Sequence, residues 1–295
     1  MSQHILKNQH LTVILEEHGA ELTSIMDNTT GIHYLWNADP AYWKRHAPVL
    51  FPFVGSLQNK SYIYQDRLYP SLQHGFARDM DFQVISNTDH EIWFSLEANE
   101  DTRRIYPFEF RLELGYRLEC RKLTCSWRVI NQGASVMYFS IGGHPAFNCP
   151  PDNGENQSAY YISFDTKDPI RYYLIDQNGL VEKDMSRDNI LLTEQGIMPI
   201  HRHLFDHDAL IIENHQSHRV SLLTPDKSPY LTVSFDAPLF GLWSPAKKNA
   251  PFVCIEPWYG RCDASDFHGT LEEREYGNIL GAGESFEAAY SIEIQ

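Results

Sequence analysis

The sequence predicts an all-β fold: a large antiparallel β-sandwich formed by a single domain that spans residues 1–295. Three observations predict it. Segments of alternating apolar and polar residues recur along the chain, which is typical of strands with one buried face. Short turns containing Asn, Asp, Pro or Gly separate them. Long stretches with the 3.6-residue period of a helix are missing, and neither a linker nor a clear repeat divides the chain.

The strands are expected in the following order. Residues 11–25 alternate and then turn, and residues 82–98 form two β-rich runs around an Asn-Thr-Asp turn, which predicts a hairpin. Residues 110–131 alternate for most of their length, residues 219–236 repeat the pattern around a Pro-Asp turn, and residues 285–295 close the chain as a strand. Short helices are expected only at residues 39–45 and 187–192.

Composition restricts the class of partner. Hydrophobic residues make up 42% of the chain and charged residues 21%, which is enough apolar material for a packed core. The net charge of -15 repels phosphate backbones and anionic lipid, so we expect neither a nucleic-acid nor a membrane partner. No apolar run is long enough to span a bilayer. The composition leaves the oligomeric state open.

The cysteines and the N-terminal segment predict a reducing compartment. The first residues lack a basic segment followed by an apolar one, so no secretory signal is expected. An odd number of cysteines without zinc-type spacing predicts small buried hydrophobic residues in a cytoplasmic protein: Cys120, Cys125, Cys149, Cys254 and Cys262.

Three short motifs place ionisable residues beside Gly, Pro and aromatic residues. They are "LQHGFARDMDF" with His74 and Arg78, "GGHPAFN" with His144, and "CIEPWYGRCD" with Glu256 and Trp258. The glycines and proline around His144 indicate a strand that ends and turns a corner, with the imidazole reachable from solvent.

Each of these residues has a functional and an ordinary interpretation. Glu256 follows an apolar run, so burial would raise its pKa and make it a stronger base once ionised. The ordinary alternative is a salt bridge at the end of a strand. His144 titrates near neutrality, yet a histidine in a turn is more often structural. His74 is either a hydrogen-bond donor to a ligand or a turn residue, and Trp258 offers a flat face for stacking on a sugar.

One cluster of ligand-type residues occurs in "HRHLFDHD", with His201, His203, Asp206, His207 and Asp208. His201 and His203 on a strand would point to one side and bind zinc. Surface loops rich in histidine are common, however, and no second cluster supports a metal site. Patterns for a hydrolase elbow or a nucleotide-binding loop are missing, and no cofactor is expected.

The motifs "HGFARDMDF", "GGHPAFNCP" and "CIEPWYG", in this order, resemble those of the aldose 1-epimerase (galactose mutarotase) family, and the match looks closest to its LacX-like branch. The resemblance covers nearly the whole chain. It implies a β-sandwich with an open sugar cleft, and an isomerase that interconverts the α and β anomers of an aldohexose. It also implies that His74 binds the substrate, His144 is the general acid and Glu256 is the general base. A sugar-binding aspartate falls on Asp206 or Asp208.

The chain departs from the family pattern at one place. Family members often carry an arginine before the first histidine, and Ser56 stands near that position here. Arg78 is expected to supply the cation from another direction. Two alternatives therefore stay open. One is a hexose 6-phosphate substrate held by basic residues at the cleft rim, with Arg78, Arg261, Lys247 and Lys248 as candidates. The other is a carbohydrate sensor or binding module without turnover.

Overall fold

The computed structural model describes residues 2–151, 157–183, 189–191 and 193–295. It confirms the antiparallel all-β class, because every named pair of neighbouring strands runs antiparallel. The hairpin expected at residues 82–98 is present, and the alternation in residues 110–131 forms two long strands. That these sheets form a single domain stays a prediction.

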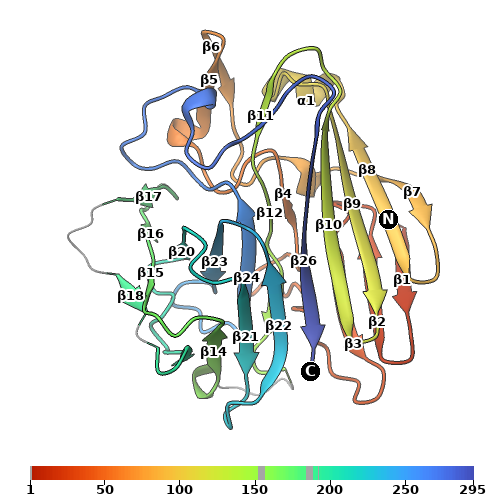
Figure 1. The fold of residues 1–295 in the computed structure, drawn as a ribbon, viewed down its shortest axis with the longest axis vertical. Coiled ribbons are helices and arrows are strands. Elements are labelled where there is room, and N and C mark those ends of the chain that lie inside the picture. The colour runs from red at the N-terminus through yellow and green to blue at the C-terminus, as the bar shows by residue number, and fades with distance from the viewer. Residues whose placement is uncertain (1, 152–156, 184–188, 192) are drawn as a thin grey trace.

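The largest sheet has nine strands. Its long central strands bury one face, which is why their sequences alternate. In spatial order the sheet consists of β19 (Ile197–Pro199), β14 (Tyr161–Phe164), β21 (Arg219–Leu223), β22 (Pro229–Phe235), β26 (Ser285–Ile294), β10 (Lys122–Asn131), β9 (Phe110–Glu119), β8 (Glu91–Glu97) and β7 (Gln83–Asn87) (Figure 1).

A second sheet of six strands carries the chemistry described below. Its central strand β24 (Phe252–Tyr259) is buried along nearly its whole length, so it reads as a continuous apolar run instead of an alternating one. In spatial order the sheet consists of β20 (Leu210–Ile212), β23 (Leu239–Trp243), β24, β12 (Ile141–Gly143) and β4 (Val49–Leu50), and β13 (Ala146–Asn148) also pairs with β24.

The remaining elements are short. A three-stranded sheet contains β1 (Gln3–Lys7), β2 (Leu11–Glu16) and β3 (Leu22–Asp27). Four strand pairs are β5 (Ser61–Tyr64) with β6 (Arg67–Pro70), β11 (Met137–Phe139) with β25 (Asn278–Leu280), β15 (Ile170–Arg171) with β18 (Ile190–Leu191), and β16 (Leu174–Ile175) with β17 (Val181–Glu182). The helical segments are α1 (Glu100–Ile105), η1 (Gln58–Lys60), η2 (Ala77–Asp79), η3 (Gln157–Ala159) and η4 (Leu271–Glu273).

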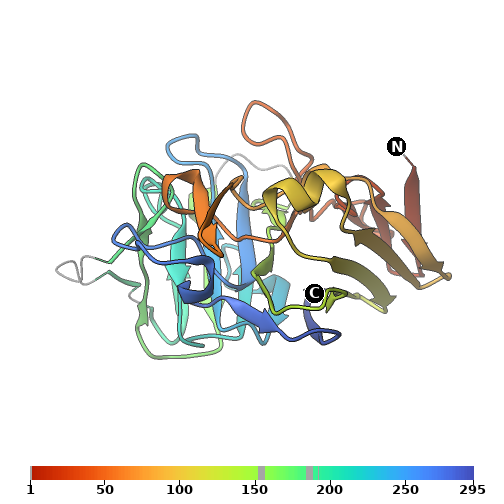
Figure 2. The ribbon, with the colours of Figure 1, turned by 90° about the horizontal axis from the view of Figure 1, so that it is seen from above.

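The two large sheets pack face to face across one hydrophobic core. Phe240 of β23 contacts Phe235 of β22, and Tyr259 of β24 contacts Phe286 of β26. At the other end, His4 of β1 contacts Phe94 of β8, and the N-terminal strands lie beside β8–β10 in both views (Figures 1 and 2). The six-stranded sheet therefore turns one face to the core and leaves its other face for a site.

The structure corrects three sequence-based expectations. Residues 39–45 form turns instead of a helix, and Ile190–Leu191 is a strand, while residues 187, 188 and 192 lie outside the described residues. Helix α1 was not expected; Asn99 caps it by accepting hydrogen bonds from the backbone of Asp101 and Thr102. Cys120 is exposed in a turn, whereas the other four cysteines are buried. None of the helices in the described part of the chain is long and apolar enough to cross a membrane.

Candidate active site

Strand pairing places His144 opposite Glu256. On one edge of β24, β13 pairs Ala146 with Cys254, and β12 pairs Gly142 with Trp258. Both pairings have the same register, so position 144 falls opposite position 256. The ladder is interrupted there because Pro145 and Pro257 have no N–H to donate. The interruption explains why a Gly-Gly-His-Pro segment is found at this point.

The outer face of the sheet forms the floor of the site. Side chains of a strand alternate between faces, so Val253 and Ile255 enter the core while Cys254, Glu256 and Trp258 point outward. Glu256 therefore does not end a strand, as the sequence suggested, but lies inside β24 with an exposed fraction of 1%.

Two glycines on the neighbouring strands make room for the Trp258 indole. A Cβ atom at Gly241 would lie 2.5 Å from Cη2 of Trp258, and one at Gly142 would lie 2.6 Å from its Cδ1. Any larger residue at either position would push the ring off the sheet. Trp258 is only 4% exposed, yet its ring forms part of a cavity wall. The expected flat apolar surface is therefore present.

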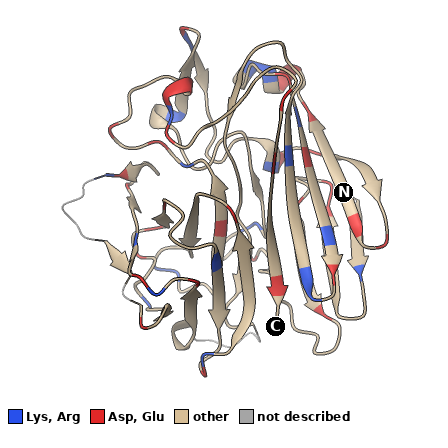
Figure 3. Cartoon of the chain, in the orientation of Figure 1, with Lys and Arg blue, Asp and Glu red and all other residues tan. Residues whose placement is uncertain are grey.

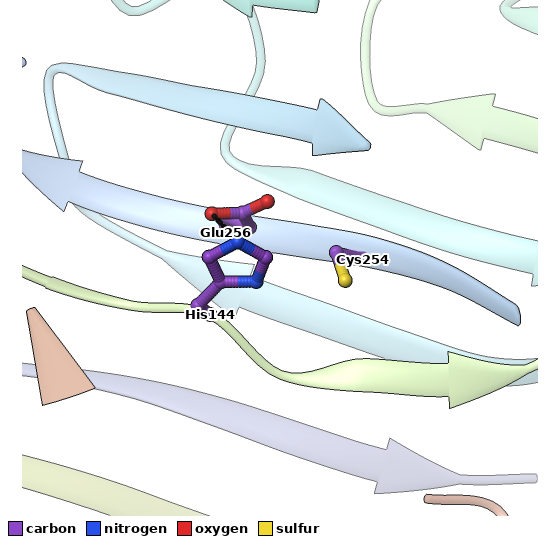
Figure 4. Close-up of side chains that lie close together, drawn as sticks. All are labelled: His144, Cys254 and Glu256. Atoms are coloured by element: carbon purple, nitrogen blue, oxygen red, sulfur yellow. Dashed lines mark ion pairs between the residues drawn. The ribbon is translucent and has the colours of Figure 1, made fainter. Parts of the chain in front are cut away.

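His144 and Glu256 are in contact. His144 Nε2 lies 3.3 Å from Glu256 Oε2, and Figure 4 shows the imidazole directed at the carboxyl group. Trp43 stacks on the His144 ring at a centroid distance of 4.7 Å, and Trp243 meets it edge-on at 5.3 Å. The expectation that His144 is open to solvent is wrong in degree, because it is 7% exposed and reachable only through the cavity.

Burial drives the two groups toward a neutral pair. It raises the pKa of the Glu256 carboxyl well above its usual value, with the negative charge of Asp208 adding to the effect. The Trp258 indole lies close enough to lower that pKa in part, although it makes no hydrogen bond of acceptable geometry. Burial, assisted by the positive charges of Arg78 and Arg45, lowers the pKa of His144 to about 3. Both shifts disfavour charge, so near neutral pH the pair is uncharged, with Glu256 protonated and His144 neutral.

A cavity of about 340 Å³ lies over this pair. Its volume is at the lower end of the range for small-molecule sites, about 300–1,000 Å³. All five residues singled out in the three motifs line it: His74, Arg78, His144, Glu256 and Trp258. The other lining residues are Trp43, Lys44, Arg45, Val54, Gly55, Gln73, Ile175, Gly179, Asp208, Ala209, Ile211, Trp243 and Cys262.

His74 is held with a defined proton position. The ring Nδ1 accepts a hydrogen bond from the backbone N–H of Gly55 at 3.1 Å. The backbone N–H of His74 in turn donates to the carbonyl of Gly55. Burial, followed by the charges of His144 and Arg78, lowers its pKa well below the usual value. A neutral ring with an accepting Nδ1 carries its proton on Nε2. His74 is thus a donor in the wall of the cavity, 5.6 Å from the His144 ring.

Asp208, and not Asp206, faces the cavity. Asp208 precedes β20 with a positive φ of 71° and lines the cavity near Glu256. Asp206 instead lines the neighbouring groove and contacts the exposed His203 at 2.7 Å. The zinc hypothesis for this segment fails on its premise, because neither His201 nor His203 lies on a strand.

Three cations form one wall of the cavity: Lys44, Arg45 and Arg78. The Asp79 carboxylate lies 2.8 Å from the Arg45 guanidinium and 3.7 Å from Arg78 Nε. Arg78 Nε is buried and makes no hydrogen bond to the described residues. Burial and the charge of Arg45 lower the pKa of Arg78 to about 10, so it stays charged at neutral pH. Ser56 is buried and lines the neighbouring groove instead.

Other cations expected at the rim are elsewhere. Arg261 is buried in ion pairs with Glu213 and Glu275, away from this cavity. Lys248 donates to the backbone carbonyls of Ala41 and Tyr42, and neither it nor Lys247 lines the cavity.

Sequence reasoning missed the Trp43–Arg45 loop, which was interpreted as a short helix. Its signal was an aromatic residue followed by two cations, directly after a proline turn. Cys254 was also missed: its thiol lies close to His144 and Glu256 (Figure 4), and the three side chains form a group with metal-ligand chemistry.

Comparisons with known proteins identify the family and agree with the fold. The family model described as aldose 1-epimerase matches residues 2–271. Protein LacX of Lactococcus lactis subsp. lactis, in its plasmid form, is 33% identical over 297 residues, covering 98% of each chain. A galactose mutarotase related enzyme from Lactobacillus acidophilus is 36% identical with a TM-score of 0.93, covering 100% of this chain and 97% of that one.

A galactose mutarotase-like protein from Lactobacillus casei is 28% identical with a TM-score of 0.90, and each chain is covered completely. A family model that spans most of the chain, together with relatives of this identity and length, is decisive. The chain belongs to the aldose 1-epimerase family, whose members are isomerases acting on carbohydrates.

Proposed function

We propose that this isomerase is a mutarotase that interconverts the α and β anomers of an aldohexose, with Glu256 as the general base and His144 as the general acid. The observation that carries the proposal is the contact between these two groups at the floor of a cavity of small-molecule size. They are 112 positions apart in sequence and meet only through the register of β24.

Unpaired polar atoms at the cavity floor support a polyhydroxylated ligand. Both Glu256 oxygens, His144 Nδ1 and Trp258 Nε1 are buried without a hydrogen-bond partner in the part of the chain that the structure describes. Buried polar groups are normally paired, so unpaired ones indicate a partner that binds from outside. Sugar hydroxyls supply donors and acceptors, while the indoles of Trp43, Trp243 and Trp258 offer apolar faces for the C–H side of the ring.

His144 and Glu256 together can supply and accept every proton that the reaction moves. In the reactive form, the Glu256 proton has moved to His144 and Glu256 is ionised; this form differs from the neutral pair by one proton transfer between groups 3.3 Å apart. Glu256 takes the proton of the C1 hydroxyl, the bond between C1 and the ring oxygen breaks, and His144 protonates that oxygen. The pair is then neutral, which burial favours.

Rotation about the C1–C2 bond presents the other face of the aldehyde, and ring closure reverses both proton transfers. Each positioned proton transfer contributes about 10²–10⁴-fold to the rate. His74 donates to a sugar oxygen from Nε2, and Asp208 accepts from a hydroxyl. Arg78 also contacts the sugar, whereas Asp206 no longer fits this role.

The test is the decay of optical rotation of freshly dissolved α-glucose and α-galactose, with proton NMR as a second readout. Catalytic amounts of the protein are expected to accelerate the decay. Glu256→Gln is expected to retain sugar binding and lose turnover, while Glu287→Gln, an exposed acid on the nine-stranded sheet, serves as the control. Acceleration by Glu256→Gln at the wild-type rate would exclude Glu256 as the base. Sugar binding without acceleration by the wild-type protein would favour a sensor or binding module.

The cationic wall favours a second candidate substrate, a hexose 6-phosphate with the same chemistry at C1. Of the rim cations expected from sequence, Arg78 lines the cavity, and Lys44 and Arg45 take the place of the others. The buried Arg78 Nε, which makes no hydrogen bond to the described residues, suits an anionic oxygen. The two substrates are distinguished by kcat/KM for glucose and for glucose 6-phosphate. The phosphate candidate is rejected if the two values are equal and inorganic phosphate does not compete with the sugar.

A further inference from the structure

We propose that His144, Cys254 and Glu256 form a binding site for a transition-metal ion of the Zn²⁺ class, and that an ion bound there blocks the isomerase. The inhibitory part rests on the proposed function; the binding part does not. The mechanism gives Cys254 no role, although its thiol lies beside the acid and the base (Figure 4).

The geometry is close to what an ion requires. One ligand atom from each residue lies within 4.8 Å of the other two. In tetrahedral zinc sites the ligand atoms are roughly 3.4–3.6 Å apart, given metal–ligand bonds of about 2.0–2.3 Å. The 3.3 Å between His144 Nε2 and Glu256 Oε2 is close to that spacing. The sulfur lies within 4.8 Å of a ligand atom of each, so a shift of at most about 1.2 Å brings it to the same spacing.

The chemistry of the three groups is also suitable. Imidazole, thiolate and carboxylate are all zinc ligands, and the combination of one sulfur with nitrogen and oxygen disfavours Mg²⁺ and Ca²⁺. The Glu256 oxygens and His144 Nδ1 are buried without partners among the described residues, so no existing hydrogen bond is lost there. On binding, the Cys254 thiol and the Glu256 carboxyl each release a proton to solvent, and neutral His144 contributes a lone pair.

The location explains why the ion would inhibit. Cys254 and Glu256 are two positions apart on β24 and share its outer face, so the sulfur lies next to the floor of the cavity. The ion enters through the cavity, which His144 and Glu256 line, and its fourth position faces the sugar pocket. Both the acid and the base then have their reactive lone pairs on the metal. Arg45 and Arg78 oppose a cation beside His144, while Asp208 favours one beside Glu256.

The test titrates Co²⁺ into metal-free protein and records the near-ultraviolet thiolate-to-cobalt charge-transfer band. The described residues contain one other ligand group, formed by His215, His218 and Asp236, so all proteins carry His218→Ala. That background is expected to show the band at one Co²⁺ per chain, with Zn²⁺ abolishing it. Cys254→Ala is expected to lose the band. Cys262→Ala, the matched control at a buried cysteine that lines the cavity, is expected to keep it.

Inhibition is read in the same proteins. Zn²⁺ is expected to slow anomer interconversion in competition with the sugar, and Cys254→Ala to weaken the inhibition at least about tenfold, since even losing a supporting hydrogen bond of a metal site costs about 10–100-fold. Absence of the band in the His218→Ala background overturns the proposal even if Cys254→Ala does not fold. Persistence of the band in folded Cys254→Ala also overturns it. A protein without isomerase activity that shows the band would refute the proposed function and retain the site.

Discussion

Two buried glutamates, one on each of the large sheets, differ in whether their carboxyl groups have charged partners. Glu113 of β9, 5% exposed, is paired with Arg111 at 2.9 Å and with Arg128 at 2.8 Å. Glu256 of β24, 1% exposed, contacts the neutral imidazole of His144 and has no hydrogen-bond partner within the described residues.

The difference distinguishes Glu113, whose charge is balanced within the fold, from Glu256, whose carboxyl is left available for chemistry. On the nine-stranded sheet, acidic and basic residues lie side by side along β8–β10 (Figure 3), and their ion pairs satisfy Glu113. On the outer face of the six-stranded sheet, Glu256 lies against the His144 ring, which Trp43 and Trp243 contact, so the burial of its carboxyl is uncompensated and shifts its pKa. Uncompensated ionisable groups in a cavity indicate a functional site. The following four changes test this contrast, from the largest expected effect to the smallest.

Replacing His144 removes the partner of Glu256. His144→Gln is expected to lower kcat by about 10²–10⁴-fold, because one positioned proton transfer is lost. Polarimetry with a fresh α-anomer measures it. His18→Gln, which alters a partly exposed histidine paired with Asp81, is the control and is expected to keep the wild-type rate. Equal rates for both variants would contradict the role of His144.

Filling the space under Trp258 deforms the floor without altering a charge. In Gly241→Ala the new Cβ lies 2.5 Å from the indole, so the ring must move. We expect a loss of about 1–3 kcal/mol in the free energy of unfolding, together with a higher KM. Chemical denaturation and Michaelis kinetics measure the two effects. Gly133→Ala, whose nearest neighbour would be at 3.3 Å, is the control. An unchanged KM would show that the indole does not contact the sugar.

The raised pKa of Glu256 predicts how stability depends on pH. Above the ordinary value of 4.5 the unfolded chain has released the proton that the folded chain still holds. The free energy of unfolding of the wild type, relative to that of Glu256→Gln, should therefore fall as the pH rises through this window, by at most about 1.4 kcal/mol per pH unit. Denaturant titrations between about pH 5 and pH 8 measure this difference. A difference that is flat or increases with pH would show that Glu256 is ionised in the folded protein.

Neutralising Glu113 should affect stability alone. Glu113→Gln breaks two ion pairs, but both arginine side chains are 38% exposed, so water screens much of their attraction. We expect a loss of about 1 kcal/mol in the free energy of unfolding, with unchanged turnover. Denaturation combined with polarimetry measures both quantities. A fall in turnover comparable to that of Glu256→Gln would remove the distinction between the two glutamates.

Local pattern was enough to predict much of the fold. Alternation identified β9 and β10, since one face of a strand in contact with solvent leaves a period of two in the sequence. It identified neither the helix α1 nor the extent of β24. Six residues with a capping box are a weak local signal, and a strand buried on both faces has no alternation to reveal it.

The sequence by itself determined the strand-rich class and the three motifs, because local residue patterns encode backbone preference and burial. Only the tertiary structure decided that His144 faces Glu256, that Asp208 and not Asp206 reaches the cavity, and that Arg45 joins Arg78 in its wall. Each of these depends on strand register or on loop packing between segments far apart in the chain. The free energy that fixes such contacts comes from the assembled sheets and their shared core, which no short stretch of sequence contains.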